Sequence, residues 1–167
     1  QSGTMDVVQS PLPESYQIIR LHPDLQLYRV PMSNVSYLAM NTSRPPFNDR
    51  RVRRAINHAV NREAIVKSVY QGMAVLARGA VAPSMWGYQP GVHTYAYDPQ
   101  LARRLLQDAG FDFSQRIRFF VLSTPRPYVP SPVLVARMVA RNLAEVGVQT
   151  ELIVQPHGDH IRALRRG

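Results

Sequence analysis

The order of apolar segments in the last third of the chain constrains the fold more than any other feature. Residues 117–122 and residues 148–154 are segments of strand length that are rich in apolar residues, and Gly147 closes the segment between them. The helical stripe of that intervening segment consists of Val135, Met138, Val139, Asn142, Leu143 and Val146. A strand, helix and strand in this order form a βαβ unit, in which the two strands are parallel and the crossover is right-handed. The sequence therefore predicts an α/β fold.

Three earlier segments also have the spacing of amphipathic helices, each preceded by a polar residue that can cap it. The predicted caps are Asn48 or Asp49 for the first helix, Asn61 for the second and Asp98 for the third. We expect Gly72 to end the second helix and Gly110 to end the third, because glycine readily adopts the left-handed conformation that follows a helix.

The segments before residue 45 show weaker patterns. Residues 25–30 and 35–40 are of strand length, with clear alternation in the first, and residues 6–8 suggest a further short strand. Residues 14–21 are expected to form one or two helical turns. Residues 73–97 are rich in glycine, proline and aromatic residues without a clear period, so we expect a long irregular connection with at most one strand, and such a connection in a compact domain is often functional.

Length and composition narrow the class of protein. A chain of 167 residues suits a single globular domain, and no stretch reaches the roughly 18 consecutive apolar residues that span a bilayer. The first eight residues lack the features of a signal peptide, so the signal of an exported parent would lie outside this sequence. The absence of cysteine excludes disulfides, thiolate nucleophiles and cysteine-based zinc sites.

The net charge of +9 raises the question of nucleic-acid binding. Lys67 is the only lysine among the 20 basic residues, and the others are arginine, a bias that indicates a GC-rich genome. These arginines are dispersed singly or in pairs along amphipathic segments, where a solvated polar face explains them. We therefore expect no nucleic-acid partner.

Catalytic and metal-binding patterns are weak. The sequence contains no nucleophile elbow, Walker phosphate loop or dinucleotide-binding glycine motif. His157 and His160 could hold a metal beside Asp159, but no third ligand is evident nearby, and a surface turn that opens the last helix is the simpler interpretation. We predict a protein that is not an enzyme and that has no catalytic residue, metal or cofactor.

The strongest candidate for a binding residue is Arg126, in the loop that follows the first strand of the βαβ unit. Ligands of open α/β sheets bind where strands give way to helices. Pro125, Pro127 and Pro130 restrict the backbone, and the guanidinium group can donate two parallel hydrogen bonds to a carboxylate. Tyr128 adds an apolar face with a polar tip. The alternative is an ordinary surface loop with a solvated arginine.

Several runs together resemble family 5 of the extracytoplasmic solute-binding proteins, which bind dipeptides, oligopeptides, nickel complexes, glutathione or haem. The runs that carry the resemblance are residues 5–8, 37–42, 46–62, 83–88, 97–110, 126–128 and 145–148, together with Gly72. They occur in the family's order over nearly the whole chain. Asn61 stands where the family usually has aspartate, and either residue caps a helix well.

The resemblance implies one lobe of a type II periplasmic-binding-protein fold, with a mixed, mainly parallel sheet flanked by helices. Residues 1–167 would form a single domain, the second of two lobes, without the first lobe of the parent protein and truncated before the chain returns to it. By resemblance to the dipeptide-binding branch, Arg126 matches the position that holds the ligand carboxylate, and Tyr128, Asn41 and Trp86 are further candidates for lining the cleft. The alternatives are a cap or turn for Asn41 and packing against its own loop for Trp86.

The function implied is that of the substrate-binding component of an ABC importer. Such a protein captures a short peptide or similar small solute between its lobes and delivers it to a membrane permease, in the periplasm or elsewhere outside the cytoplasm. The alternative is the ligand-sensing domain of a transcriptional regulator. The sequence leaves open which solute is bound and whether an isolated lobe binds it.

Overall fold

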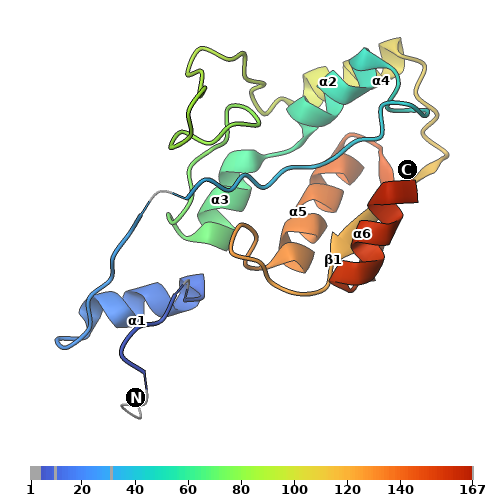
Figure 1. Cartoon of the computed structure of the whole chain (residues 1–167). Coiled ribbons are helices and arrows are strands. Elements are labelled where there is room, and N and C mark those ends of the chain that lie inside the picture. Colours follow the sequence, from blue (N-terminus) through green and yellow to red (C-terminus); the bar gives the residue numbers. More distant parts are fainter. Residues whose placement is uncertain (1–4, 10, 31, 167) are drawn as a thin grey trace.

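The computed structural model describes residues 5–9, 11–30 and 32–166, and it consists of helices around a pair of strands (Figure 1). The elements in chain order are η1 (Pro13–Ser15), α1 (Tyr16–Leu21), α2 (Arg50–Ala59), α3 (Arg62–Tyr70), α4 (Pro99–Asp108), β1 (Arg116–Leu122), α5 (Pro132–Glu145), β2 (Gln149–Gln155) and α6 (His157–Arg166). None of the described helices combines the length and apolar composition that a membrane crossing requires.

The predicted βαβ unit is confirmed. β1 and β2 pair in parallel, with Phe119 opposite Leu152, and α5 connects them. α5 packs on one face of the strand pair and α6 lies on the other (Figure 1). The α/β prediction is therefore correct, and the carboxyl end of β1 opens directly into the loop that carries Arg126.

The three predicted helices and their caps are also confirmed. The side chain of Asp49 accepts a hydrogen bond from the backbone N–H of Arg51. The side chains of Asn61 and Asp98 each accept one from the backbone N–H three residues later, at 2.9 and 2.8 Å. Each cap satisfies a backbone donor that the first turn of a helix leaves free.

The end of α3 differs in detail from the prediction. The helix ends at Tyr70, and Gln71 is already left-handed, with φ of 47°, one residue before Gly72 at φ of 80°. Gly110 follows α4 with φ of 69°, as expected.

The predictions of strands at residues 6–8, 25–30 and 35–40 are wrong for this chain. These segments are extended or irregular, and within the described residues the only strands are β1 and β2. A strand requires a partner for its backbone hydrogen bonds, and the described chain provides none for these three segments. The helical turns expected at residues 14–21 are present as η1 and α1.

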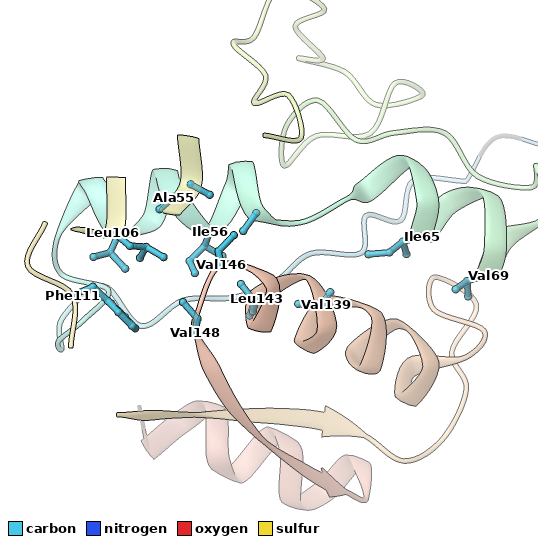
Figure 2. Close-up of a cluster of buried hydrophobic side chains, with 13 residues drawn as sticks. Ala55, Ile56, Ile65, Val69, Leu106, Phe111, Val139, Leu143, Val146 and Val148 are labelled. Atoms are coloured by element: carbon cyan, nitrogen blue, oxygen red, sulfur yellow. The ribbon is translucent and has the colours of Figure 1, made fainter. Parts of the chain in front are cut away.

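The hydrophobic core lies between the α2, α3 and α4 side and the α5 and β2 side of the molecule (Figure 2). α2 packs along α4, and α5 packs along β2. The buried residues that form the core are Val52, Ala55, Ile56, Ala59, Ile65, Val69, Ala102, Leu106, Phe111, Val139, Leu143, Val146 and Val148. Apart from Phe111 and Val148, they lie at positions that the helical spacing of the apolar residues predicts to be buried, so periodicity identified most of the core.

The segment between α3 and α4 is a long irregular connection, as predicted, and its final residues are tied to the helices. The ring Nδ1 of His58 lies 2.8 Å from the carbonyl oxygen of Ala96, and the guanidinium group of Arg62 donates to the carbonyl of Tyr95. The ring of Tyr95 also packs edge-on against His58. The end of this connection is therefore ordered by side chains of α2 and α3.

The N-terminal part of the chain buries little of its apolar surface. α1 lies away from the other α-helices and the strand pair (Figure 1). Ile18, Leu21, Tyr28 and Tyr37 are each at least two-thirds exposed. This part of the chain has apolar side chains available for contacts that the described residues do not make.

Candidate ligand-binding site

The segment 123–131, between β1 and α5, contains a closed tight turn. The backbone N–H of Arg126 donates to the carbonyl of Val129 at 3.0 Å, and the N–H of Val129 donates back to the carbonyl of Arg126 at 2.9 Å. Pro127 occupies the first corner of the turn, where its fixed φ is suited. Val129 is buried, so the turn is anchored on the domain.

The guanidinium group of Arg126 has an unused donor. The residue is half-buried, and its Nε atom is buried without a hydrogen-bond partner among the described residues. A buried donor without a partner costs free energy, and the cost is larger for a charged group. The arrangement is suited to an acceptor that comes from outside this part of the chain, and a carboxylate is the acceptor whose geometry matches a guanidinium group.

Tyr128 takes the second corner of the turn, and its side chain is 37% exposed. Its carbonyl oxygen makes neither of the turn's own hydrogen bonds and instead accepts one from the hydroxyl of Tyr70, at 2.9 Å. Burial raises the pKa of Tyr70 above its ordinary value, and the hydroxyl of Ser36 opposes this shift. Tyr70 therefore keeps its proton near neutral pH and remains a donor.

Tyr70 is a residue of the site region that sequence reasoning missed. Helical spacing puts Tyr70 on the apolar side of α3, with Ile65 and Val69, and it indicates no role for the hydroxyl. It lies 58 residues before Tyr128 in the chain. No local pattern can report such a contact, because only the packing of α3 beside the turn creates it.

Asn41 lies in a turn, and its side chain is engaged locally. Its Oδ1 atom accepts hydrogen bonds from the backbone N–H and from the hydroxyl of Ser43, at 3.0 and 2.7 Å. This is an Asx turn, in which a short polar side chain closes its own loop. The side chain is exposed, and its role in lining a cleft remains a prediction.

Trp86 is fully exposed, with 100% of its surface accessible. The alternative that it packs against its own loop is therefore wrong. A fully exposed tryptophan offers a large apolar surface for a contact outside the described residues, and such side chains are frequent at contact sites. Within the described part of the chain, no hydrogen bond or ring contact links Trp86 or Asn41 to Arg126.

The candidate residues therefore do not form a closed pocket in this chain. A groove of about 320 Å³ lies elsewhere, between the start of α3 and the end of the long connection, and Arg62, Glu63, Tyr95 and Tyr97 are among its lining residues. None of the four predicted site residues lines it. The structure brings together Arg126 and Tyr128 in one turn and leaves Asn41 and Trp86 on separate surface segments.

His157 and His160 lie in the first turn of α6, as expected for a segment that opens the last helix. Asp159 is paired with Arg162 three residues later. Among the described residues, no group of three or more histidine, aspartate or glutamate side chains is arranged to hold a metal ion.

Comparison with known proteins identifies the family. Residues 1–164 match the model of the bacterial extracellular solute-binding proteins, family 5 Middle. The chain is 36% identical over 159 residues to the dipeptide-binding protein of Escherichia coli, covering 94% of this chain and 30% of that protein. It is 31% identical over 167 residues to heme-binding protein A of Haemophilus influenzae, covering all of this chain and 30% of that protein.

The fold agrees with this assignment. The crystal structure of the dipeptide-binding protein from Pseudoalteromonas sp. SM9913 in complex with Met-Leu superposes with a TM-score of 0.84 at 29% identity, over 94% of this chain and 31% of that one. The chain thus spans about 30% of the length of the relatives it matches, and it has the α/β architecture of part of a type II periplasmic binding protein. Its sequence and its fold together show that the chain belongs to family 5 of the bacterial extracellular solute-binding proteins.

Proposed function

We propose that this chain is the second lobe of a two-lobe substrate-binding component of an ABC importer. The parent protein would capture a short peptide, or a similar small solute with a carboxylate, between its lobes and deliver it to a membrane permease. It would act outside the cytoplasm, in the periplasm or attached to the membrane. It would bind its solute without chemical change, in keeping with relatives that are named as binding proteins.

The observation that carries the proposal is the unpartnered Nε atom of Arg126 in a rigid turn at the carboxyl end of β1. An arginine in such a turn loses little backbone entropy when it binds a carboxylate, because the turn already fixes its backbone. No described residue offers an acceptor to Nε, so the guanidinium group has hydrogen-bonding capacity that the described chain leaves unused. Both effects favour recognition of an anionic group at this place.

The exposed apolar residues support the assignment to one lobe of a larger protein. Trp86, Tyr28 and Tyr37 are among the most exposed large side chains of the described chain. In a two-lobe protein such residues would face the other lobe, the hinge or the ligand. Asn41, Trp86 and Tyr128 remain proposed contacts of the cleft.

The relatives that the chain matches are named for different solutes. One relative is named for dipeptides and another for heme, at 36% and 31% identity. Both dipeptides and heme carry carboxylates, so a single arginine at this position suits either. We favour the short peptide because the more similar of these two relatives and the Pseudoalteromonas structure both have dipeptides in their names.

Isothermal titration calorimetry of the full-length protein with a panel of dipeptides, glutathione and heme tests the proposal. We expect saturable binding of a short peptide, and we expect Arg126→Ala to weaken it by at least about tenfold, because a charge-assisted hydrogen bond is lost. Arg137→Ala is the matched control, since Arg137 is an exposed arginine on α5. Equal affinities for wild type and Arg126→Ala would remove Arg126 from the site, and no binding of any peptide would contradict the proposed substrate class.

A further inference from the structure

The turn that carries Arg126 is fastened to the domain at a second point, at the end of α3. Tyr70 is the last residue of α3, and its hydroxyl donates to the carbonyl of Tyr128 at 2.9 Å. Tyr128 lies between Arg126 and Val129, whose backbones are joined by two hydrogen bonds. A link to the corner of this turn therefore restrains the whole turn.

We infer that Tyr70 is a positioning residue for ligand binding, which orients the turn so that the guanidinium group of Arg126 meets the ligand carboxylate. The inference rests on the proposed function, because it assigns Tyr70 a role through Arg126. Tyr70 itself does not touch the ligand in this proposal. Its hydroxyl restrains the position of the turn relative to α3.

The geometry explains why such a link is needed. The turn's two internal hydrogen bonds fix its shape, and buried Val129 fixes one end. These bonds lie within the turn, and the chain joins it to β1 and α5 at its two ends. The bond from Tyr70 adds a restraint from α3, which is outside this segment, and it acts on the carbonyl of Tyr128, two residues after Arg126. Accurate placement matters because a bidentate pair of arginine and carboxylate depends on alignment.

The neutral state of Tyr70 is also required. A phenolate could not donate to a carbonyl oxygen. Tyrosine is ordinarily protonated at neutral pH, and burial raises the pKa of Tyr70 further. Phenylalanine retains the ring that packs at the edge of the core and removes only the donor. Tyr70→Phe is therefore a specific test of the hydrogen bond.

The test compares two ligands on the full-length protein: the dipeptide that binds best in the panel, and the same dipeptide with a C-terminal amide. The ratio of the two dissociation constants measures how well the protein recognises the carboxylate. We expect Tyr70→Phe to reduce this ratio by about three- to tenfold, the value of one net hydrogen bond, with unchanged affinity for the amide. Arg126→Ala should bring the ratio close to one.

Tyr97→Phe is the matched control. The hydroxyl of Tyr97 donates to the carboxylate of Glu145 at 3.1 Å, in a contact that does not involve the turn, so its removal should leave the ratio unchanged. A wild-type ratio for Tyr70→Phe overturns the inference, and so does an equal loss of affinity for both ligands, which would indicate a general structural role. If the wild-type protein binds no dipeptide, the proposed function fails first. If the wild-type protein binds the free dipeptide much more tightly than the amide, and only Arg126→Ala removes this difference, the proposed function stands and the role of Tyr70 is wrong.

Discussion

The side chain of Asn142, in the last turn of α5, accepts a hydrogen bond from the backbone N–H of Asn61, at 3.0 Å across 81 residues of sequence. Asn61 in turn caps α3 through its own side chain, which accepts from the N–H of Ala64 at 2.9 Å. The side chain of Asn142 thus links α5 to the start of α3. Together the two asparagine side chains satisfy the backbone N–H groups of Asn61 and Ala64, which have no acceptor within the helix itself.

Substitution of Asn142 tests the strength of this link. We expect Asn142→Ala to lower the free energy of unfolding by about 1–2 kcal/mol, because it leaves a partly buried N–H without a partner. Equilibrium unfolding in urea measures the loss. Arg137→Ala, at an exposed position of the same helix, should change stability by no more than about 0.5 kcal/mol. Equal stabilities for the two variants would show that the link between the asparagines contributes nothing.

Gly147 connects α5 to β2 under two constraints. Its φ is 93°, and a Cβ atom built there would lie 3.0 Å from Cδ1 of Phe113. Gly147→Ala should therefore destabilise the protein by about 1–3 kcal/mol, through backbone strain and crowding. Gly79→Ala is the control, because nothing lies within 4 Å of a Cβ atom at that position and its φ is not positive. Thermal unfolding of the two variants measures the difference in stability. A wild-type melting temperature for Gly147→Ala would show that neither the backbone conformation nor the contact with Phe113 requires glycine at this position.

We expect His160 to make the stability of the protein depend on pH, because the pKa of its imidazole is lowered in the folded chain. Burial lowers the pKa of His160 below its ordinary value, and the charge of His157 lowers it further. The folded state then binds fewer protons than the unfolded state between the lowered pKa and about 6.5. The contribution of His160 to stability is full above about pH 6.5 and is lost as the pH falls through this window.

Urea unfolding at pH 7.5 and 5.5 measures this dependence. We expect His160→Gln to reduce the loss of stability between the two pH values, because glutamine does not titrate. His93→Gln serves as a comparison, since it removes an exposed histidine far from α6 in the sequence. An identical pH dependence in wild type and His160→Gln would show that the ring of His160 is not coupled to folding.

The single tryptophan provides a probe of the proposed cleft. Trp86 is fully exposed, so its fluorescence in this chain should be that of an indole in water, and soluble quenchers should reach it freely. In the full-length protein, the proposed function predicts that ligand addition shields Trp86 from iodide quenching. The contribution of Trp86 is obtained by subtracting the signal of Trp86→Phe. Unchanged quenching on saturation with ligand would remove Trp86 from the cleft.

Most helices of residues 50–166 could be predicted because their signals are local. Asp49, Asn61 and Asp98 cap helices with their own side chains, and the apolar stripes that follow supply much of the core. The βαβ unit followed from the same periodicity, because a strand of seven residues and a crossover helix leave few alternatives for pairing. The position of Arg126 after β1 was a consequence of that order.

The errors have a single physical cause. Residues 25–30 and 35–40 have the lengths and, in the first, the alternation of strands, but a strand exists only when another segment accepts its hydrogen bonds, and the described chain offers none. A sequence pattern reports which face of a segment is apolar, and it does not report whether a partner is present.

Local patterns in the sequence were therefore sufficient for the helices, the βαβ unit, the core stripes and the loop that presents Arg126. The contact between Tyr70 and Tyr128, the link between Asn61 and Asn142, and the full exposure of Trp86 emerged only from the folded chain. Caps and apolar stripes depend on residues a few positions apart, whereas these contacts depend on how α3 and α5 pack. Tyr70 and Tyr128 are separated by 58 positions in the sequence, and Asn61 and Asn142 by 81. A short stretch of sequence carries no information about contacts between residues so far apart.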